Sequence, residues 1–427
     1  MQREHIGKTL CNQKPSFVPA TLCTALLARQ DHAMPDPASD QTVMAEPPYC
    51  GDMPMRPGAM VLRDPKGGVA ALFRGRRVAF SFNTRTALRQ ACDLLGLQPG
   101  DEVLAPAYNC GSELDPLLHA GLKVMFFPVD WQASVDVAAI EACITPRTRA
   151  IYLIHYFGFL QPMTAALRAL CDARRLFLIE DCALSLLSGA APAEGRAGDI
   201  SVFCFYKFFP TIGGGALVIN NDRIAGEARF EKKLPLRMTG KPLLRASFDM
   251  ALGAERRTAL MRRLKPGPSD PIAASGIESD AHPDMPSDYY FDDRLRGARI
   301  NGLTARQIRS FDISAATATR RSNYRTYLAA FTGLQGIAPL FPHLPAEACP
   351  LSMPVLVENR DALAKKLAAQ GIVATPWWAG YNRHLDFTDQ PEACHLKNHV
   401  LSLPCHQYLG EAEVRYIASV LQVLGAG

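Results

Sequence analysis

Three buried strands are predicted by a single stretch of the chain, residues 177–220, which reads FLIEDCALSLLSGAAPAEGRAGDISVFCFYKFFPTIGGGALVIN. Short apolar runs lie at 176–179, 200–203 and 216–219. Their length and their content of β-branched or aromatic residues are typical of buried strands rather than of helices. This stretch therefore favours a protein built on a buried sheet.

Polar groups stand at the ends of these runs. The first run ends in Glu180-Asp181, the second leads to Lys207 within an aromatic segment, and the third follows the glycines at 213–215. Side chains at the ends of neighbouring buried strands converge on one crevice, where burial and mutual charge tune the pKa values of a carboxylate and a lysine. The sequence therefore predicts a site for chemistry at this edge of the sheet.

The order and spacing of these residues resemble a known family. An Ile-Glu-Asp strand end, a lysine 26 positions after the aspartate (207 − 181) and a glycine cluster directly after the lysine are similar to the core of the DegT/DnrJ/EryC1/StrS sugar aminotransferases. The resemblance extends upstream to Asn83 and, more weakly, downstream to the C-terminus. It implies pyridoxal 5′-phosphate (PLP) as the cofactor and the fold type I of PLP enzymes.

Strand and helix patterns alternate from Val78 to Ile219, which predicts an α/β fold with a mostly parallel sheet covered by helices. The resemblance implies a seven-stranded sheet of the aspartate aminotransferase type and a smaller C-terminal α+β domain. We expect four parts: a poorly ordered tail at 1–55, a large PLP-binding domain at 56–260, a flexible linker at 261–300 and the small domain at 301–427.

Patterns outside the sheet are less regular. A basic helical segment at 251–264 is interpreted as a solvated face, with a membrane-surface or partner-binding face as the alternative. Residues 265–288 are rich in Pro, Ser, Asp and Gly and predict a flexible excursion. In the small domain we expect one long helix at 303–331 and strands at 351–357 and 371–375.

A strand feeds a helix through the small polar residues at 83–88, Asn-Thr-Arg-Thr-Ala-Leu. Unpaired first-turn N–H groups and the positive end of the helix dipole make such a place an anion site. On the residues alone, a plain N-cap at Asn83 or Thr84 is the favoured alternative. The family holds the PLP phosphate here with Ser-Gly-Thr-Ala-Ala-Leu, so the resemblance implies that Thr84, Arg85 and Thr86 bind the phosphate.

Two further cofactor contacts are implied by the resemblance. Tyr108 follows a predicted strand where the family carries an aromatic residue that stacks on the cofactor ring, although the commonest position is that of Cys110. His155 ends another predicted strand within His-x-x-Gly, which the family places beside the cofactor. On the residues alone, a half-buried loop tyrosine explains Tyr108 equally well, and a structural histidine is the favoured interpretation of His155.

Lys207 and Asp181 match two groups that PLP chemistry requires. A lysine must bond to the cofactor aldehyde and move a proton, so its amine must lose its charge in a partly desolvated pocket. The aromatic residues at 205–209 supply such surroundings for Lys207. A carboxylate must keep the pyridine nitrogen protonated, and Asp181 is placed for that role. Taken singly, a surface lysine and a helix N-cap explain these residues equally well, but their combination points to PLP.

Two residues depart from the family. Leu184 stands three places after the aspartate, where members carry Gln or His near the phenolic oxygen of the cofactor. Val202 stands five places before the lysine, where members carry a phosphate-binding serine. We expect Cys204 or Ser201 to substitute for that serine. These departures leave PLP binding in place and bear on the substrate.

Composition argues against several other classes. A net charge of +5 suits a phosphate-bearing small molecule and gives little support to nucleic-acid binding, which needs a concentrated basic face. Twelve cysteines are scattered without a C-x-x-C pair or metal-like spacing, which favours a reducing, cytoplasmic setting and no metal. No apolar run approaches the roughly 18 residues that span a bilayer, and the run at 21–28 is short for a signal peptide.

We therefore expect an aminotransferase that moves an amino group from an amino acid, which the resemblance implies is glutamate, to a keto-sugar, most simply a nucleotide-linked one, in surface polysaccharide or secondary-metabolite biosynthesis. The resemblance also implies a homodimer, with Asn301 as the residue contributed across the interface. A PLP-dependent sugar dehydratase and an inactive sugar-nucleotide-binding relative are the alternatives. Typical dehydratases carry histidine in place of Lys207. A dinucleotide-binding oxidoreductase is disfavoured because no G-x-G-x-x-G follows a strand.

Overall fold

The structure is a computed structural model that describes residues 48–55, 68–191, 193–234, 284–378 and 380–425, with isolated positions between 240 and 256. The tail at 1–47, most of the basic segment at 251–264 and the excursion up to residue 283 lie outside the described residues. Among the described helices, none combines the length and the apolar character that crossing a bilayer requires.

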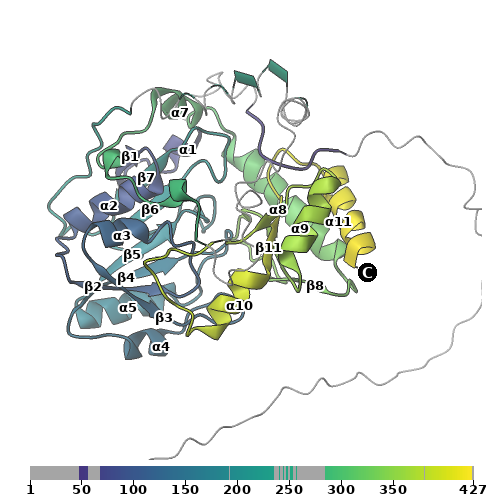
Figure 1. Ribbon diagram of the computed structural model, residues 1–427. Helices are drawn as coiled ribbons and strands as arrows, with labels where there is room; N and C mark the ends of the chain where they lie inside the picture. Colours follow the sequence, from purple (N-terminus) through teal and green to yellow (C-terminus); the bar gives the residue numbers. More distant parts are fainter. Residues whose placement is uncertain are drawn as a thin grey trace, which may run out of the picture. The chain divides into compact units, whose positions relative to one another are not determined.

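A seven-stranded sheet forms the first part of the fold, with the strand order β1-β7-β6-β5-β4-β2-β3 (Figure 1). The neighbouring pairs from β3 to β6 are parallel, and β7 runs antiparallel to both β6 and β1. This arrangement confirms the predicted mostly parallel, seven-stranded sheet. The strands are β1 (Arg77–Ser81), β2 (Glu102–Pro106), β3 (Lys123–Phe127), β4 (Thr148–Ile154), β5 (Phe177–Cys182), β6 (Ile200–Cys204) and β7 (Gly215–Ile219).

Helices connect and cover these strands. The N-terminus of α2 is fixed by its cap, because the Asn83 side chain accepts a hydrogen bond from the Thr86 N–H at 2.8 Å. Helix α2 then packs against β6 and β7, and α5 packs against β5. The helices of this part are α1 (Gly68–Ala71), α2 (Thr84–Leu94), α3 (Asp115–His119), α4 (Val137–Ala142) and α5 (Thr164–Arg174).

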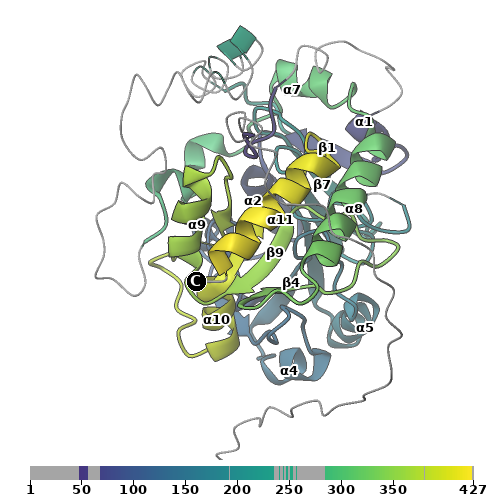
Figure 2. The same cartoon turned by 90° about the vertical axis from the view of Figure 1, so that its right-hand side faces the viewer.

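A smaller antiparallel sheet forms the C-terminal part, with the strand order β10-β11-β9-β8. Helix α11 lies between α8 and α9 and crosses this sheet (Figure 2). Its strands are β8 (Ile337–Pro339), β9 (Met353–Val357), β10 (Thr375–Pro376) and β11 (Val400–Leu403). The helices of this region are η2 (Ser287–Tyr289), η3 (Asp293–Leu295), α7 (Gly302–Gln307), α8 (Ile313–Ala330), α9 (Arg360–Ala369), α10 (Pro391–His399) and α11 (Glu411–Gly425).

Two expectations for these regions were wrong. The long helix predicted at 303–331 is two helices, because Asp312 caps a new N-terminus at α8 by accepting the Ala315 N–H at 2.8 Å. The last residues of the predicted tail are packed, since Cys50 is fully buried and its N–H donates to the Gly371 carbonyl at 2.9 Å. The Cys50 side chain packs against the C-terminal part and thereby orders a segment whose composition resembles that of a linker.

Arg320 ties the two sheets to one another. Its side chain is fully buried and donates to the carbonyl oxygens of Phe208 at 3.0 Å and Leu351 at 2.8 Å. Burial lowers the pKa of this guanidinium, but a buried arginine keeps its charge and needs acceptors for every N–H. The backbone that follows β6, where Lys207 lies, is therefore held against the C-terminal part.

Gly158 provides a test of this contact between the parts. It has φ +94°, and a Cβ at this position would overlap the carbonyl oxygen of Cys349. We expect Gly158→Ala to lower the free energy of unfolding by about 3 kcal/mol, from roughly 1 kcal/mol of backbone strain and a further 1–3 kcal/mol of overpacking. Gly96→Ala is the matched control, because Gly96 has φ +65° and open space around it. Equal losses for both variants in urea titrations would contradict the close approach.

Candidate active site

The adjacent carboxylates of β5 face opposite sides of the sheet. Side chains alternate along a strand, so Glu180 and Asp181 diverge although they are neighbours in sequence. In the parallel register, Glu180 lies beside Ser201 and Asp181 lies beside Val202. The two faces of the sheet therefore carry different groups at β5. The charge of Lys207 acts on the face that carries Asp181.

Asp181 is buried and surrounded by donors. The Tyr152 hydroxyl donates to its Oδ2, and the Ala183 N–H donates to Oδ1 at 2.7 Å. Burial raises the pKa of the Asp181 carboxyl, while the Tyr152 hydrogen bond and the positive charge of Lys207 oppose that rise. The charge of Lys207 therefore acts on the Asp181 carboxyl.

Lys207 lies at the edge of a cavity of about 170 Å³. Its Nζ is 5.9 Å from the centroid of the Trp377 ring. The Trp377 Nε1 and the Ser352 Oγ are buried and have no hydrogen-bond partner among the described residues. Buried polar atoms without partners are costly and mark places where a ligand can bind. The cavity is lined by residues from both parts of the fold, including Asp52, Met53, Lys207, Ser352, Ser402 and His406.

The start of α2 lies against the sheet where the sequence predicted a phosphate site. A Cβ at Gly215 would lie 2.9 Å from the backbone nitrogen of Thr84, so only glycine leaves this approach open. The Thr84 hydroxyl donates to the Phe203 carbonyl at 3.1 Å, and the Thr86 hydroxyl donates to the Leu295 carbonyl at 3.4 Å. Both hydroxyls thus have partners within the chain, and the Thr86 N–H is taken by the Asn83 side chain, as in a plain N-cap.

Arg85 is engaged by a different segment. Its Nη1 donates to the backbone carbonyls of Asp288 at 3.3 Å and Tyr290 at 3.2 Å, and also to that of Tyr289. The guanidinium therefore holds the segment at 288–290 in place. Sequence alone offered no sign of this role, because the two segments are about 200 positions apart.

The structure separates the two expected substitutes for the missing serine. Cys204 is fully buried, follows Val202 on the Asp181 side of β6, and shares a hydrogen bond with the Thr84 side chain. Ser201 lies on the Glu180 side, where its hydroxyl donates to the Gly195 carbonyl at 2.6 Å. Of the two, Cys204 alone faces the predicted cofactor site, and burial raises the pKa of its thiol, so it is a neutral group.

Tyr108 lies within an aromatic cluster. It is fully buried, its hydroxyl donates to the Trp377 carbonyl at 3.0 Å, and its ring centroid is 4.9 Å from that of Trp378. Cys110 is only partly buried, and the charge of Lys207 acts on its thiol. The Tyr108 ring therefore packs in the core, and Cys110 lies nearer the surface.

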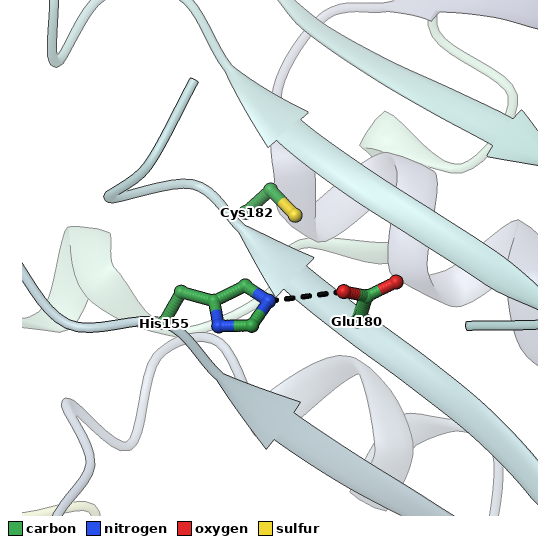
Figure 3. Close-up of side chains that lie close together, drawn as sticks. All are labelled: His155, Glu180 and Cys182. Atoms are coloured by element: carbon green, nitrogen blue, oxygen red, sulfur yellow. Dashed lines mark hydrogen bonds and ion pairs between the residues drawn. The ribbon is translucent and has the colours of Figure 1, made fainter. Parts of the chain in front are cut away.

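The His155 side chain lies close to Glu180 and Cys182, on the face of β5 that is opposite to Asp181 (Figure 3). The Gln161 N–H donates to its Nδ1 at 3.0 Å, so Nδ1 is an acceptor and the proton lies on Nε2, which donates to Glu180 at 3.0 Å. Although burial acts to raise it, the pKa of Glu180 is lowered by His155 and the Gly198 N–H.

The same three side chains have the ligand types of a metal site. Both ring nitrogens of His155 are occupied, and burial raises the pKa of the Cys182 thiol well above its usual range. A metal requires a free imidazole nitrogen and a thiolate. The cluster therefore acts as a structural hydrogen-bond network.

A sequence model of the DegT/DnrJ/EryC1/StrS aminotransferase family matches residues 69–248 and 303–422. The chain belongs to this family. It is thus an aminotransferase-family enzyme, and the family is PLP-dependent, with solved members in PLP and pyridoxamine-phosphate forms. The Lys207–Asp181 pair that suggested the family lies within the first matched range.

Curated relatives include sugar-nucleotide aminotransferases. The chain is 28% identical over 349 residues, 79% of its own length and 81% of the relative's, to a UDP-N-acetyl-3-dehydro-alpha-D-glucosamine 3-aminotransferase of Acidithiobacillus ferrooxidans. It is 35% identical over 155 residues to a dTDP-3-amino-3,4,6-trideoxy-alpha-D-glucose transaminase of Micromonospora megalomicea, covering 34% of the chain and 40% of that protein.

Solved structures share the fold. The aminotransferase TlmJ from Streptoalloteichus hindustanus aligns with a TM-score of 0.59 at 21% identity, covering 88% of this chain and 92% of that one. The putative sugar aminotransferase Spr1654 from Streptococcus pneumoniae, in its PMP form, aligns with a TM-score of 0.61 at 17% identity, covering 88% and 92%. The sheet and the smaller C-terminal sheet are therefore those of the aminotransferase fold.

The occupied nitrogens of His155 give a test with added metal. We expect the melting temperature to stay the same after dialysis against EDTA and after addition of equimolar ZnCl₂, because both ring nitrogens of His155 have partners and burial raises the pKa of the Cys182 thiol, which keeps it protonated. Differential scanning calorimetry measures both. A zinc-dependent rise in melting temperature that His155→Gln abolishes would show that the network opens to bind metal.

Proposed function

We propose that the protein is a PLP-dependent aminotransferase that moves an amino group from an amino acid, glutamate, to a keto-sugar, in the simplest case one linked to a nucleotide. The observation that carries this proposal is the buried Asp181 carboxyl under the charge of Lys207, in the order and fold of the family. The amino donor and the keto-sugar bind in turn at Lys207, which moves a proton in each half of the exchange.

The residues present fit PLP. Asp181 offers a buried carboxylate for the pyridine nitrogen, and the close approach of Gly215 to Thr84 places the first turn of α2, with its backbone N–H groups, beside this end of the sheet. Cys204 and Thr84 border this approach on the same side as Asp181. When bound to a lysine, PLP supplies an electron sink for the carbon that loses a proton.

The chain's own groups divide the remaining work. Asp181 keeps the ring-nitrogen proton because Tyr152 and the Ala183 N–H stabilise its anion. Lys207 accepts the proton from the reacting carbon and returns it, within reach of the cavity that a substrate enters. Arg320 holds the backbone at Phe208 and thereby fixes the position from which Lys207 acts.

The size of the cavity beside Lys207 suits binding of one part of the acceptor inside it, with the other part outside. Its volume of about 170 Å³ is below the roughly 300–1,000 Å³ of pockets that enclose drug-sized ligands. An amino acid or a single sugar ring fits such a volume, and a nucleotide would lie beyond it. Relatives named for UDP-linked and dTDP-linked sugars support this substrate class.

A homodimer and a cytoplasmic location are part of this proposal. The expected interface residue Asn301 is used within its own chain, since it caps α7 and its Nδ2 donates to the Ile212 carbonyl at 2.6 Å. The Asn301 side-chain amide therefore stabilises the backbone of its own chain. A contact across the proposed dimer interface would be made in addition to these hydrogen bonds.

Covalent capture tests the proposal directly. Incubation with PLP followed by borohydride should place the cofactor on Lys207, as peptide mass spectrometry reads out, and Lys207→Ala should lose the adduct. In a separate PLP-loaded sample without borohydride, added glutamate should remove the visible absorption of the bound cofactor in the wild type. A protein that captures no PLP contradicts the proposal, and one that keeps its absorption with every amino donor is the inactive relative.

Tyr152→Phe tests the support of Asp181. Burial already raises the pKa of Asp181, and loss of the Tyr152 hydrogen bond raises it further, so the anion is lost at a higher pH. A hydrogen bond to a charged group contributes about 1.5–3 kcal/mol, or roughly 1–2 pH units. We expect the pH below which PLP affinity falls to rise by that amount. Tyr327→Phe, a buried tyrosine bonded to the Pro404 carbonyl, should leave this pH limit unchanged.

A further inference from the structure

Three hydroxyl side chains of the C-terminal region line the cavity beside Lys207. Thr375 in β10 and Ser402 in β11 are opposite each other in an antiparallel pair, so their side chains share one face of the sheet. Ser402 is also paired with Pro354 in β9, and Ser352 stands two residues before Pro354, which places it on that face as well. We call Ser352, Thr375 and Ser402 the hydroxyl row.

Ser352 has a hydroxyl that the protein itself does not use. The residue is 7% exposed, and its Oγ has no hydrogen-bond partner within the part of the chain that the structure describes. Ser188 shows the usual state of a buried serine, because its hydroxyl donates to the Gly158 carbonyl at 2.6 Å and accepts the Cys349 N–H at 3.0 Å. A buried hydroxyl without a partner costs free energy, and a bound ligand can supply the missing hydrogen bond.

Arg320 and His406 also line the cavity, but both are occupied by other groups of the chain. His406 Nε2 lies 2.7 Å from the Gly51 carbonyl oxygen, and burial lowers the pKa of this imidazole to about 4, so the ring is neutral at pH 7. Neither residue therefore offers a cation to a bound carboxylate. The guanidinium nitrogens of Arg320 donate to the Gln407 side chain and to the carbonyls of Pro350, Leu351 and Phe208.

The other charged side chains of this lining are Asp52 and Lys207. An acid on the lining repels a carboxylate, and the Lys207 amine is the group that takes the cofactor in the proposed function. A neutral ligand with several hydroxyls suits such a cavity, because serine and threonine hydroxyls both donate and accept hydrogen bonds. Of the two proposed substrates, glutamate carries carboxylates, whereas the sugar ring of the acceptor carries neutral hydroxyls.

We propose that the cavity binds the sugar ring of the acceptor, and that the hydroxyl row, with Ser352 foremost, determines specificity by hydrogen bonds to the ring hydroxyls. The inference rests on the proposed function for the class of acceptor. The cavity of about 170 Å³ has room for one sugar ring, so the nucleotide lies beyond it. The carboxylates of the amino donor are then recognised by groups outside the hydroxyl row.

Ser352→Ala tests the proposal in two measurements. Because the Ser352 hydroxyl has no partner in the free protein, its removal should leave the melting temperature unchanged or raise it, whereas Ser188→Ala, the matched control, should lower it. In calorimetric titrations with PLP present, the probes are UDP-N-acetylglucosamine and dTDP-glucose, which lack a keto group and bind without reacting. We expect Ser352→Ala to weaken binding of these probes about fivefold, the equivalent of roughly 1 kcal/mol for one hydrogen bond.

The free nucleotides UDP and dTDP separate the sugar from the rest of the ligand, and their affinity should be the same for the wild type and for Ser352→Ala. An equal loss for the free nucleotides, an unchanged affinity for the sugar probes, or a wild type that binds neither sugar probe overturns the inference. Capture of PLP on Lys207 and its reaction with glutamate leave the proposed aminotransferase chemistry standing in each of these cases. If no PLP is captured while Ser352→Ala weakens binding of the sugar probes, the proposed function fails and the sugar site stands.

Discussion

The buried carboxylate of Asp181 is the constraint on which the site depends. A carboxylate taken out of water must be matched by donors and positive charge, or it takes up a proton instead. Here the Tyr152 hydroxyl, the Ala183 N–H and the charge of Lys207 supply that match from β4, from the end of β5 and from the segment after β6. The strand ends are therefore held in one relative arrangement by the same interactions that prepare the chemistry.

Because side chains alternate along a strand, the groups at the proposed site and the groups that support the fold lie on opposite faces of the sheet. Glu180 and Asp181 are adjacent, yet Glu180 is committed to His155, the Gly198 N–H and Ser201 on one face. That network occupies both ring nitrogens of His155 and both carboxylate oxygens of Glu180. Asp181 faces the other way, toward Lys207, Cys204 and the start of α2. One residue of register would exchange the two roles, because side chains alternate with a period of two.

The two sheets are joined by a buried charge, and the cavity at Lys207 lies at this junction. Arg320 is buried with its charge and is satisfied chiefly by backbone carbonyls, from Phe208 beside Lys207 to Leu351 before β9. Gly158 allows the loop after β4 to touch Cys349 in the same region. The cavity at Lys207 thus has one wall from each part of the fold, and Ser352 brings a buried polar atom to it from the C-terminal part.

The sequence by itself determined the strands of the large sheet and its mostly parallel topology, because short apolar runs and strand-end polar residues are local signals. It also led to the right family from the spacing of Asp181, Lys207 and the glycines. Only the tertiary structure decided which face each polar residue takes. It turned His155 toward Glu180, packed Tyr108 in the core and bound Arg85 to the backbone at 288–290. These contacts join residues about 25 to 200 positions apart, and their geometry depends on register and packing that no local pattern records.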